Sequence, residues 1–360
     1  MEEQTIQTQE LYYPAADTLK FWLMPFVCVA CFGFPSRYGS LVSALCGFAP
    51  LCFYILCGFF AFSGDAGDER LRFKRGAGRS GLMFLIMALV CFAANAAFYL
   101  LRGVGVSELL GGLLRRRVVF NFVVLSVWPF QMGDSISFIQ SLFYAYVLLF
   151  LASGLFHSGK ARLAVMLACF AVALLTGELA GLLPFRILGY ACLPQNVVSC
   201  ALPYLLLGGL LREKREAMQE RPAILWILMV PLGLALTCGE FWLLNALGLL
   251  VTTAQSVGLG VAAFGLCAFV LCECETVGQS LPYDEPPAIS FFAVSGRYFA
   301  RNIYLISQPV AFLLLVPASF FLPRLAYAVQ MLGGLVIYAV CFVAVFLVNA
   351  MVSSVVNGEV

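Results

Sequence analysis

The sequence has little charge. Of its 360 residues, 11% are charged and 62% are hydrophobic, and the mean hydropathy is +0.96. A soluble domain carries roughly 25% charged residues. A water-soluble fold of this length is therefore excluded, because it could not bury so much apolar surface. The net charge of +2 and the lack of a long basic tract also exclude a nucleic-acid-binding protein.

The sequence also lacks the common catalytic and metal-binding motifs. It has one histidine, His157, which we expect to be solvated in a turn, and it has no G-x-S-x-G, H-E-x-x-H or P-loop pattern. The segment Cys272-Glu273-Cys274-Glu275 lacks the C-x₂₋₄-C spacing and a second ligand pair, so we expect no metal site there. Most other cysteines fall in apolar runs, where they behave as small hydrophobes.

What the sequence does contain is a series of long apolar runs with short connections. A helix needs about 20 apolar residues to cross the bilayer, and these runs do not alternate as the strands of a membrane barrel do. We therefore expect an all-α, polytopic integral membrane protein with about ten transmembrane helices. The expected spans are 18–34, 40–62, 81–101, 135–156, 163–183, 196–211, 223–239, 255–272, 291–316 and 325–350.

The positions of the basic residues indicate the orientation of these spans. Basic residues gather between the second and third, the fourth and fifth, and the sixth and seventh spans. The positive-inside rule places these connections and both termini in the cytoplasm. The connection 102–117, which contains Arg115, Arg116 and Arg117, contradicts this pattern. The apolar stretch 118–132 after it is either an interfacial or re-entrant segment, which we favour, or an additional span.

No part of the chain predicts a soluble domain. Residues 1–17 form a polar N-terminal segment, 18–350 a helical bundle and 351–360 a tail, so that 1–360 is one membrane domain. Gly208-Gly209 and Gly333-Gly334 are expected to be helix-packing sites.

Polar groups inside apolar runs are costly and point to functional positions. Asp17 and Lys20 are three residues apart, which predicts an ion pair on one helix face. Arg301 lies deep in the ninth span and needs a partner or water; Glu178 and Glu240 are candidate partners.

Six motifs, in order, resemble those of the type-3 membrane acyltransferases. The first is Asp17-Thr18-Leu19-Lys20, which in that family opens the first span and is followed eleven residues later by a histidine; here that position is Cys31. The others are APLCFYILCGFF (49–60), LRFKRGAGR (71–79), FIQSLFYAYVLL (138–149), QNVVSCALPYLLLGG (195–209) and RYFARNIYLISQPV (297–310). Of these, 71–79 matches the basic loop that follows the second span in the family, so we expect a loop there.

The sequence departs from the family pattern at both of its hallmark histidines. The second of these positions is Ser307, Gln195 replaces an arginine, and Cys57 replaces a serine. Glu240 falls where the family often has a glutamate. These departures leave four possibilities open: Cys31 as a nucleophile that carries the acyl group, Glu240 or Glu178 as a substitute base, a family member without activity, and the family's ordinary chemistry by a route that the sequence does not show.

The resemblance implies an integral-membrane O-acyltransferase of the cell membrane. It would move an acyl group, such as acetyl, from a cytoplasmic acyl-CoA to a hydroxyl of a surface glycan or lipid-linked acceptor, with no other cofactor. The implied catalytic positions are Cys31, Ser307 and Glu240. The implied positions for substrate or acyl-CoA binding are Lys20, Arg75, Arg79, Gln195, Asn196, Arg301 and Tyr304. The alternative is a catalytically inactive member that acts as a transporter or scaffold.

Overall fold

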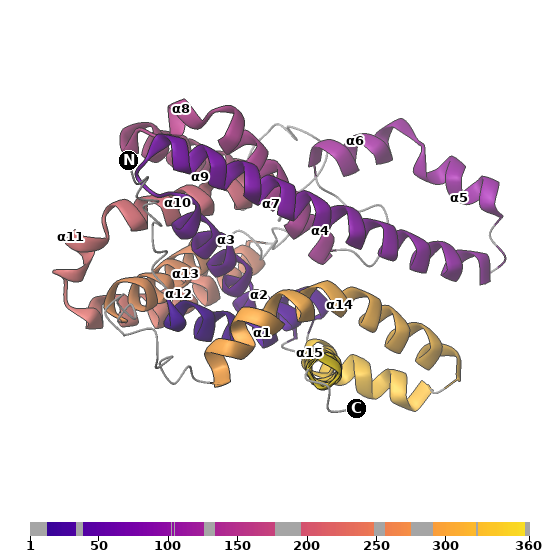
Figure 1. Cartoon of the computed structure of the whole chain (residues 1–360). Helices are drawn as coiled ribbons and strands as arrows, with labels where there is room; N and C mark the ends of the chain where they lie inside the picture. Colours follow the sequence, from indigo (N-terminus) through magenta and orange to yellow (C-terminus); the bar gives the residue numbers. More distant parts are fainter. Residues whose placement is uncertain are drawn as a thin grey trace.

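A computed structural model describes residues 13–33, 39–101, 103, 105–125, 134–176, 196–247, 256–274, 291–321 and 323–356. These residues form helices joined by turns, with no strand among them, which confirms the expected all-α class. Figure 1 shows α4 and α7 on one side of the molecule, α14 and α15 on the other, and α1 and α3 between them.

The helices follow the apolar runs closely. Their bounds are α1 Pro14–Phe32, α2 Gly39–Cys46, α3 Phe48–Ala61, α4 Ala66–Leu101, α5 Val106–Leu113, α6 Arg116–Leu125, α7 Asp134–Leu151, α8 Ser153–Phe156, α9 Gly159–Thr176, η1 Val197–Ala201, α10 Leu202–Glu213, α11 Arg215–Gln219, α12 Ala223–Ala246, α13 Val257–Ala268, η3 Phe269–Glu273, α14 Phe291–Phe321 and α15 Pro323–Val356. The segments η1 and η3 are single π-helical turns that continue into or out of an α-helix.

Five stretches in the described ranges are long and apolar enough to cross a membrane. They are Pro14–Phe32, Gly39–Ala61, Ala66–Ala97, Ala223–Ala246 and Gly333–Met351. Their outer faces carry large apolar side chains that water would not tolerate: Leu82 and Leu89 of α4 are 59% and 61% exposed, and Trp242 of α12 is 72% exposed. The chain is therefore a membrane protein with several apolar helices.

The basic stretch before the third expected span is helical, and the expectation of a loop there was wrong. Helix α4 begins at Ala66 and continues without a break to Leu101. Asp68 and Glu69 stand in its first turn, where carboxylates interact favourably with the helix dipole. Arg72, Arg75 and Arg79 consequently project from one face of a rigid helix.

The ambiguous apolar stretch 118–132 is only partly described. Its first residues belong to α6, which has ten residues and a rise of about 15 Å, roughly half of the hydrocarbon thickness. Residues 126–133 lie outside the described ranges. The part of this stretch that the structure describes therefore covers about half of a span.

Glycine pairs allow neighbouring helices to pack closely, as we expected for Gly208 and Gly334. A Cβ on Gly58 of α3 would overlap the Leu205 carbonyl of α10, and a Cβ on Gly208 would overlap the Ile55 carbonyl of α3. Gly334 of α15 meets the Cys28 carbonyl of α1 in the same way. Gly333, at a φ of 24°, kinks α15 and so lets it turn against α1.

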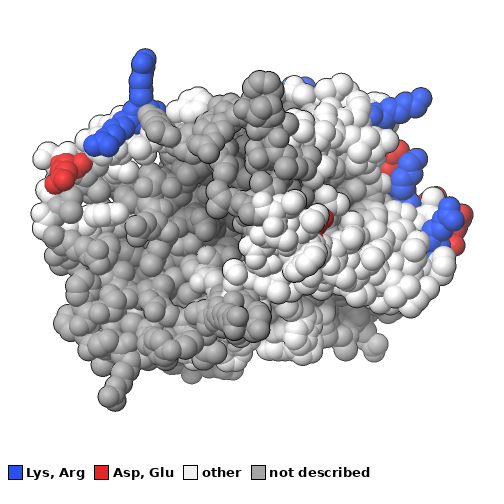
Figure 2. All heavy atoms as spheres, turned by 180° about the vertical axis from the view of Figure 1, so that it is seen from behind, with Lys and Arg blue, Asp and Glu red and all other residues white. Residues whose placement is uncertain are grey.

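Charge is confined mainly to the ends of the molecule. Figure 2 shows Lys, Arg, Asp and Glu side chains toward two ends of the visible face, with mostly uncharged described residues between them. One end contains the start of α1, the end of α3 and the start of α4. Tyr13 packs on the Phe59 and Phe60 rings at centroid distances of 5.5 and 5.4 Å, and Arg72 Nη1 donates to the Phe60 carbonyl at 3.1 Å. We call this the basic end.

Candidate functional site

A cavity of about 1260 Å³ opens among α1, α3, α4, α7, α10 and α14. This volume exceeds the roughly 300–1,000 Å³ that is common for small-molecule sites, so a large organic ligand would fit. The cavity brings together six of the residues implied by the family resemblance: Lys20, Cys31, Arg75, Arg79, Arg301 and Tyr304. These residues come from only three helices, α1, α4 and α14, and are up to 284 positions apart in the sequence.

Helical periodicity explains why each helix contributes its residues. The residues that α1 contributes to the wall include Asp17, Lys20, Met24, Val27 and Cys31, spaced three or four residues apart on one face. Each series is polar near the start of its helix and apolar farther in. In α4, Arg72, Arg75 and Arg79 are followed on the same face by Met83.

The cavity therefore has a charged part at the basic end and an apolar part deeper inside. Among the described lining residues, seven are basic and three are acidic, an excess of four positive charges. The seven are Lys20, Arg72, Arg75, Arg79, Arg212, Arg297 and Arg301. Positive charge next to a low-dielectric wall attracts an anionic ligand.

The acidic residues of the wall already have partners. Asp17 Oδ1 is 2.7 Å from Lys20 Nζ, which confirms the expected ion pair, and Asp68 Oδ2 is 2.7 Å from Arg72 Nε. Asp65 accepts a hydrogen bond from the Asp68 backbone N–H at 2.9 Å. These contacts are local and stabilise the first turns of α1 and α4.

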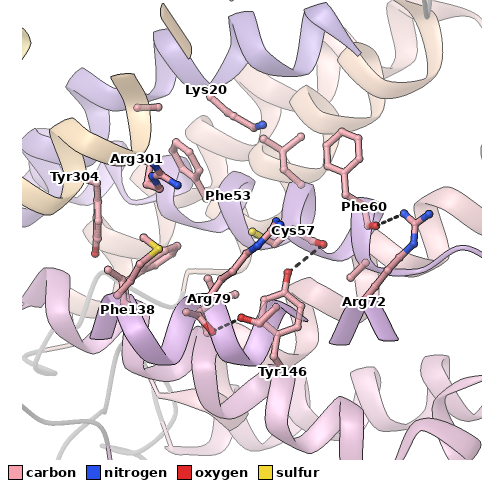
Figure 3. Close-up of a pocket in the computed structure, with 18 of the residues that line it drawn as sticks. Lys20, Phe53, Cys57, Phe60, Arg72, Arg79, Phe138, Tyr146, Arg301 and Tyr304 are labelled. Carbon is pink, nitrogen blue, oxygen red and sulfur yellow. Dashed lines mark hydrogen bonds between the residues drawn. The ribbon is translucent and has the colours of Figure 1, made fainter. Parts of the chain in front are cut away.

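Three arginines of the cavity, in contrast, form no ion pair with the acidic side chains that the structure describes. They are Arg75 and Arg79 of α4 and Arg301 of α14, all of which are exposed. Figure 3 shows Arg79 and Arg301 extending into the space between the helices. Guanidinium groups in this arrangement are suited to bidentate recognition of phosphate or carboxylate.

Arg212 shows how the wall keeps a cation near the ligand space. Its guanidinium lies 5.3 Å from the centroid of the Phe59 ring. Burial lowers the pKa of Arg212 from its usual value, and the nearby Arg72 and Arg215 act in the same direction. Arginine nevertheless remains protonated in proteins, so Arg212 adds positive charge to the site.

The apolar part of the wall is formed largely by aromatic and aliphatic side chains. Tyr304 packs on the Phe138 ring at a centroid distance of 5.5 Å, and Phe138 stacks on Tyr54 at 4.3 Å. Met83, Leu142 and Ile139 continue this surface. A ligand whose anionic head binds the arginines could pack an apolar tail against this surface.

Four of the implied site residues are absent from the described lining of the cavity. Ser307 is buried in α14, and its Oγ donates to the Tyr304 carbonyl at 2.8 Å. Glu240 accepts a hydrogen bond from Ser256 and so links α12 to the start of α13. Asn196 caps η1, where its Oδ1 accepts from the Val198 N–H at 2.6 Å. Gln195 lies outside the described residues, as does Glu178.

The single histidine lies elsewhere. His157 follows α8, and its Nδ1 is 3.4 Å from the buried Glu69 carboxylate. Glu69 also accepts from the Ser63 and Gly64 backbone N–H groups at 3.3 and 2.9 Å. His157 therefore supports the α3–α4 corner and is not among the described residues that line the cavity.

Sequence reasoning missed several residues of the cavity, above all Arg72, Arg212 and Tyr146. Arg72 could have been found by interpreting 71–79 as helix, because Arg72, Arg75 and Arg79 then share one face. Arg212 and Tyr146 carry no comparable signal, because only the packing of α10 and α7 brings them to the site. No known family model, no curated protein and no solved structure matches this chain.

Proposed function

We propose that this chain is a cell-membrane O-acyltransferase that binds acyl-CoA at the basic end of its cavity. It would transfer the acyl group to a hydroxyl of a surface glycan or lipid-linked acceptor. The observation that supports this proposal most is the convergence of Lys20, Cys31, Arg75, Arg79, Arg301 and Tyr304, all taken from the motif resemblance, on one cavity.

The division of the cavity fits the two parts of the donor. The phosphates of acyl-CoA require positive charge, which Arg75, Arg79 and Arg301 supply without an acidic partner among the described residues. The pantetheine arm and acyl group are less polar, and the inner wall of Phe53, Met83 and Phe138 suits them. Lys20 lies between these parts, where positive charge stabilises an oxyanion that forms on the thioester carbonyl.

The proposal includes an orientation. The basic end would face the cytoplasm, where acyl-CoA is found, in agreement with the positive-inside rule. Both termini would also be cytoplasmic, and about ten spans would be completed by helices shorter than those already long enough to cross, such as Ile136–Leu151 and Val257–Glu273.

A second function is favoured by one observation. No histidine is among the described residues of the cavity wall, and each of the three carboxylates described there already has a partner. A hydroxyl acceptor needs a base for attack on a thioester. A protein that binds or transports a phosphate-bearing amphiphile without acyl transfer would need only the arginines and the apolar wall.

The first experiment measures thermal unfolding of the detergent-purified protein with and without acetyl-CoA. A ligand that binds the folded state raises Tm in proportion to its concentration relative to Kd. We expect acetyl-CoA to raise Tm, acetyl-pantetheine without the phosphates to have little effect, and Arg79→Ala or Arg301→Ala to abolish the protection. Arg116→Ala is the matched control, because Arg116 is exposed on α6 and lies outside the cavity lining.

Release of free CoA then separates the two functions. Protection accompanied by CoA release in the presence of membrane extract supports acyl transfer. Protection without any release supports the carrier. If acetyl-CoA leaves Tm unchanged in the wild-type protein, the acyl-CoA proposal is rejected.

A further inference from the structure

We propose that Cys57 accepts the acyl group from the donor and carries it as a thioester before the hydroxyl acceptor is attacked. This inference rests on the proposed binding of acyl-CoA. It differs from the expectation that Cys31 would be the nucleophile, and it follows from where the two thiols lie in the cavity.

Cys57 and Cys31 both line the cavity, but at different depths. Cys57 is on α3, one turn before the end of that helix at Ala61, and therefore close to the basic end. Cys31 is on α1, eleven residues and about 16 Å of rise beyond Lys20. The proposed function places the thioester carbonyl beside Lys20, and Figure 3 shows Lys20 on the side of the cavity that Cys57 also lines.

The surroundings of Cys57 suit an acyl exchange. The Tyr146 hydroxyl donates to the Cys57 carbonyl at 3.5 Å, which brings a phenol from α7 next to this residue. Figure 3 shows Lys20 and Arg79 extending into the cavity on either side of Cys57, from α1 and α4. These cations would stabilise the negative oxygen of a tetrahedral intermediate.

The chemistry balances without an additional reactant. In the first step the Cys57 Sγ–carbon bond forms, the carbon–sulfur bond to CoA breaks, and the Cys57 proton ends on the CoA sulfur. One thioester replaces another, so the exchange is close to thermoneutral. In the second step the acceptor oxygen bonds to the acyl carbon, the Sγ–carbon bond breaks, and the hydroxyl proton returns to Cys57. A covalent intermediate of this kind divides one difficult transfer into two steps.

This scheme also removes the need for a histidine in the first step. A thiol is intrinsically more nucleophilic than a hydroxyl, so it depends less on a strong base. The serine that the related family has at this position could not form a thioester, whereas Cys57 can. Attack of the acceptor hydroxyl on the Cys57 thioester, in the second step, still needs a base.

The experiment is peptide mapping after incubation with [14C]acetyl-CoA in detergent, together with the thermal measurement of acetyl-CoA binding on the same samples. We expect one acetyl group per chain on the Cys57 peptide, removable by neutral hydroxylamine. Cys57→Ala should lose at least nine-tenths of the label and still be protected by acetyl-CoA. Cys238→Ser should keep the label, because Cys238 is exposed on α12, away from the cavity wall, and reports chemical background.

Two results would overturn the inference in different ways. If acetyl-CoA binds but Cys57 stays unlabelled, or if Cys31→Ala removes the label instead, the role of Cys57 is rejected and the acyltransferase proposal stands. If acetyl-CoA does not protect the wild-type protein, the donor proposal itself fails and the covalent step fails with it.

Discussion

Asp17 and Lys20 form an ion pair with an Oδ1–Nζ distance of 2.7 Å, one helical turn apart on α1, and both side chains line the cavity. Asp17 therefore offsets part of the positive charge that would bind a ligand phosphate. The two residues should then have opposite effects on ligand affinity, although they touch each other.

The first prediction concerns this pair. Lys20→Ala should weaken acetyl-CoA binding about three- to tenfold, because one positive charge is lost from the wall, whereas Asp17→Asn should strengthen it by a similar factor, since about 1 kcal/mol corresponds to a factor of five. Titration followed by Tm measures both. If both variants weaken binding equally, the pair serves only to position α1.

The second prediction concerns the crossing of α3 and α10. Gly208→Ala should lower the free energy of unfolding by about 1–3 kcal/mol, because the new Cβ would overlap the Ile55 carbonyl and force the helices apart. Gly239→Ala is the control: its Cβ meets nothing within 4 Å, and alanine favours helix by about 1 kcal/mol. Detergent-denaturation midpoints measure the difference. Equal stability of the two variants would contradict a tight crossing.

The third prediction concerns Arg162, which is 5% exposed in the α9–α10 contact. Its Nη2 is 2.8 Å from Glu213 Oε2, and its guanidinium is 4.8 Å from the Phe62 ring centroid. Arg162→Met should lower the free energy of unfolding by about 1–2 kcal/mol. This loss is smaller than for a fully buried ion pair, because the Glu213 side chain is 34% exposed and can be hydrated again.

Lys160→Met provides the comparison for Arg162→Met. Lys160 is exposed at the start of the same helix, and a substitution there should remain within about 0.5 kcal/mol of the wild type. Thermal unfolding of the two variants, measured side by side, gives the difference in stability. A Lys160 variant as unstable as the Arg162 variant would assign the effect to α9 propensity.

The fourth prediction separates Glu240 from the ligand. Ser256 Oγ accepts from the Leu259 N–H at 3.4 Å as the cap of α13, and it donates to Glu240. Ser256→Ala should cost about 1 kcal/mol of stability through the lost cap, and leave the affinity for acetyl-CoA unchanged. Glu240→Gln should also leave affinity and CoA release unchanged. A tenfold fall in CoA release for Glu240→Gln at constant affinity would show that Glu240 acts in the chemistry.

The local sequence predicted much of the fold because the physical causes are local. Where the structure describes the apolar runs, they are helical, since backbone groups in lipid must bond within their own segment. The Asp17–Lys20 pair followed from a spacing of three residues. The interpretation of 71–79 as a loop is wrong. The many charged residues of this stretch suggest contact with solvent, whereas in the structure the stretch is helical and its arginines face the cavity.

The cavity itself was only partly predictable. The motif resemblance suggested Lys20, Cys31, Arg75, Arg79, Arg301 and Tyr304, but no rule from the sequence alone places α1, α4 and α14 around one space. Glu240 and Ser307 seemed equally eligible, and packing turned them toward Ser256 and the Tyr304 carbonyl instead. The partner of Glu240 is Ser256, at the start of another helix, whereas the partner of Ser307 is Tyr304, on the same helix.

The sequence by itself determined that this chain resides in a membrane and is built of helices, because 62% hydrophobic residues in long runs leave no other stable arrangement. It also predicted the Asp17–Lys20 pair on one face of α1. Only the tertiary structure decided that these faces enclose one cavity with Cys57 at its basic end. Helix crossings depend on close contacts between residues that are far apart in the chain, such as Gly58 with Leu205 and Gly208 with Ile55. The sequence marks Gly208-Gly209 as a packing site, but it does not show which helix that site meets.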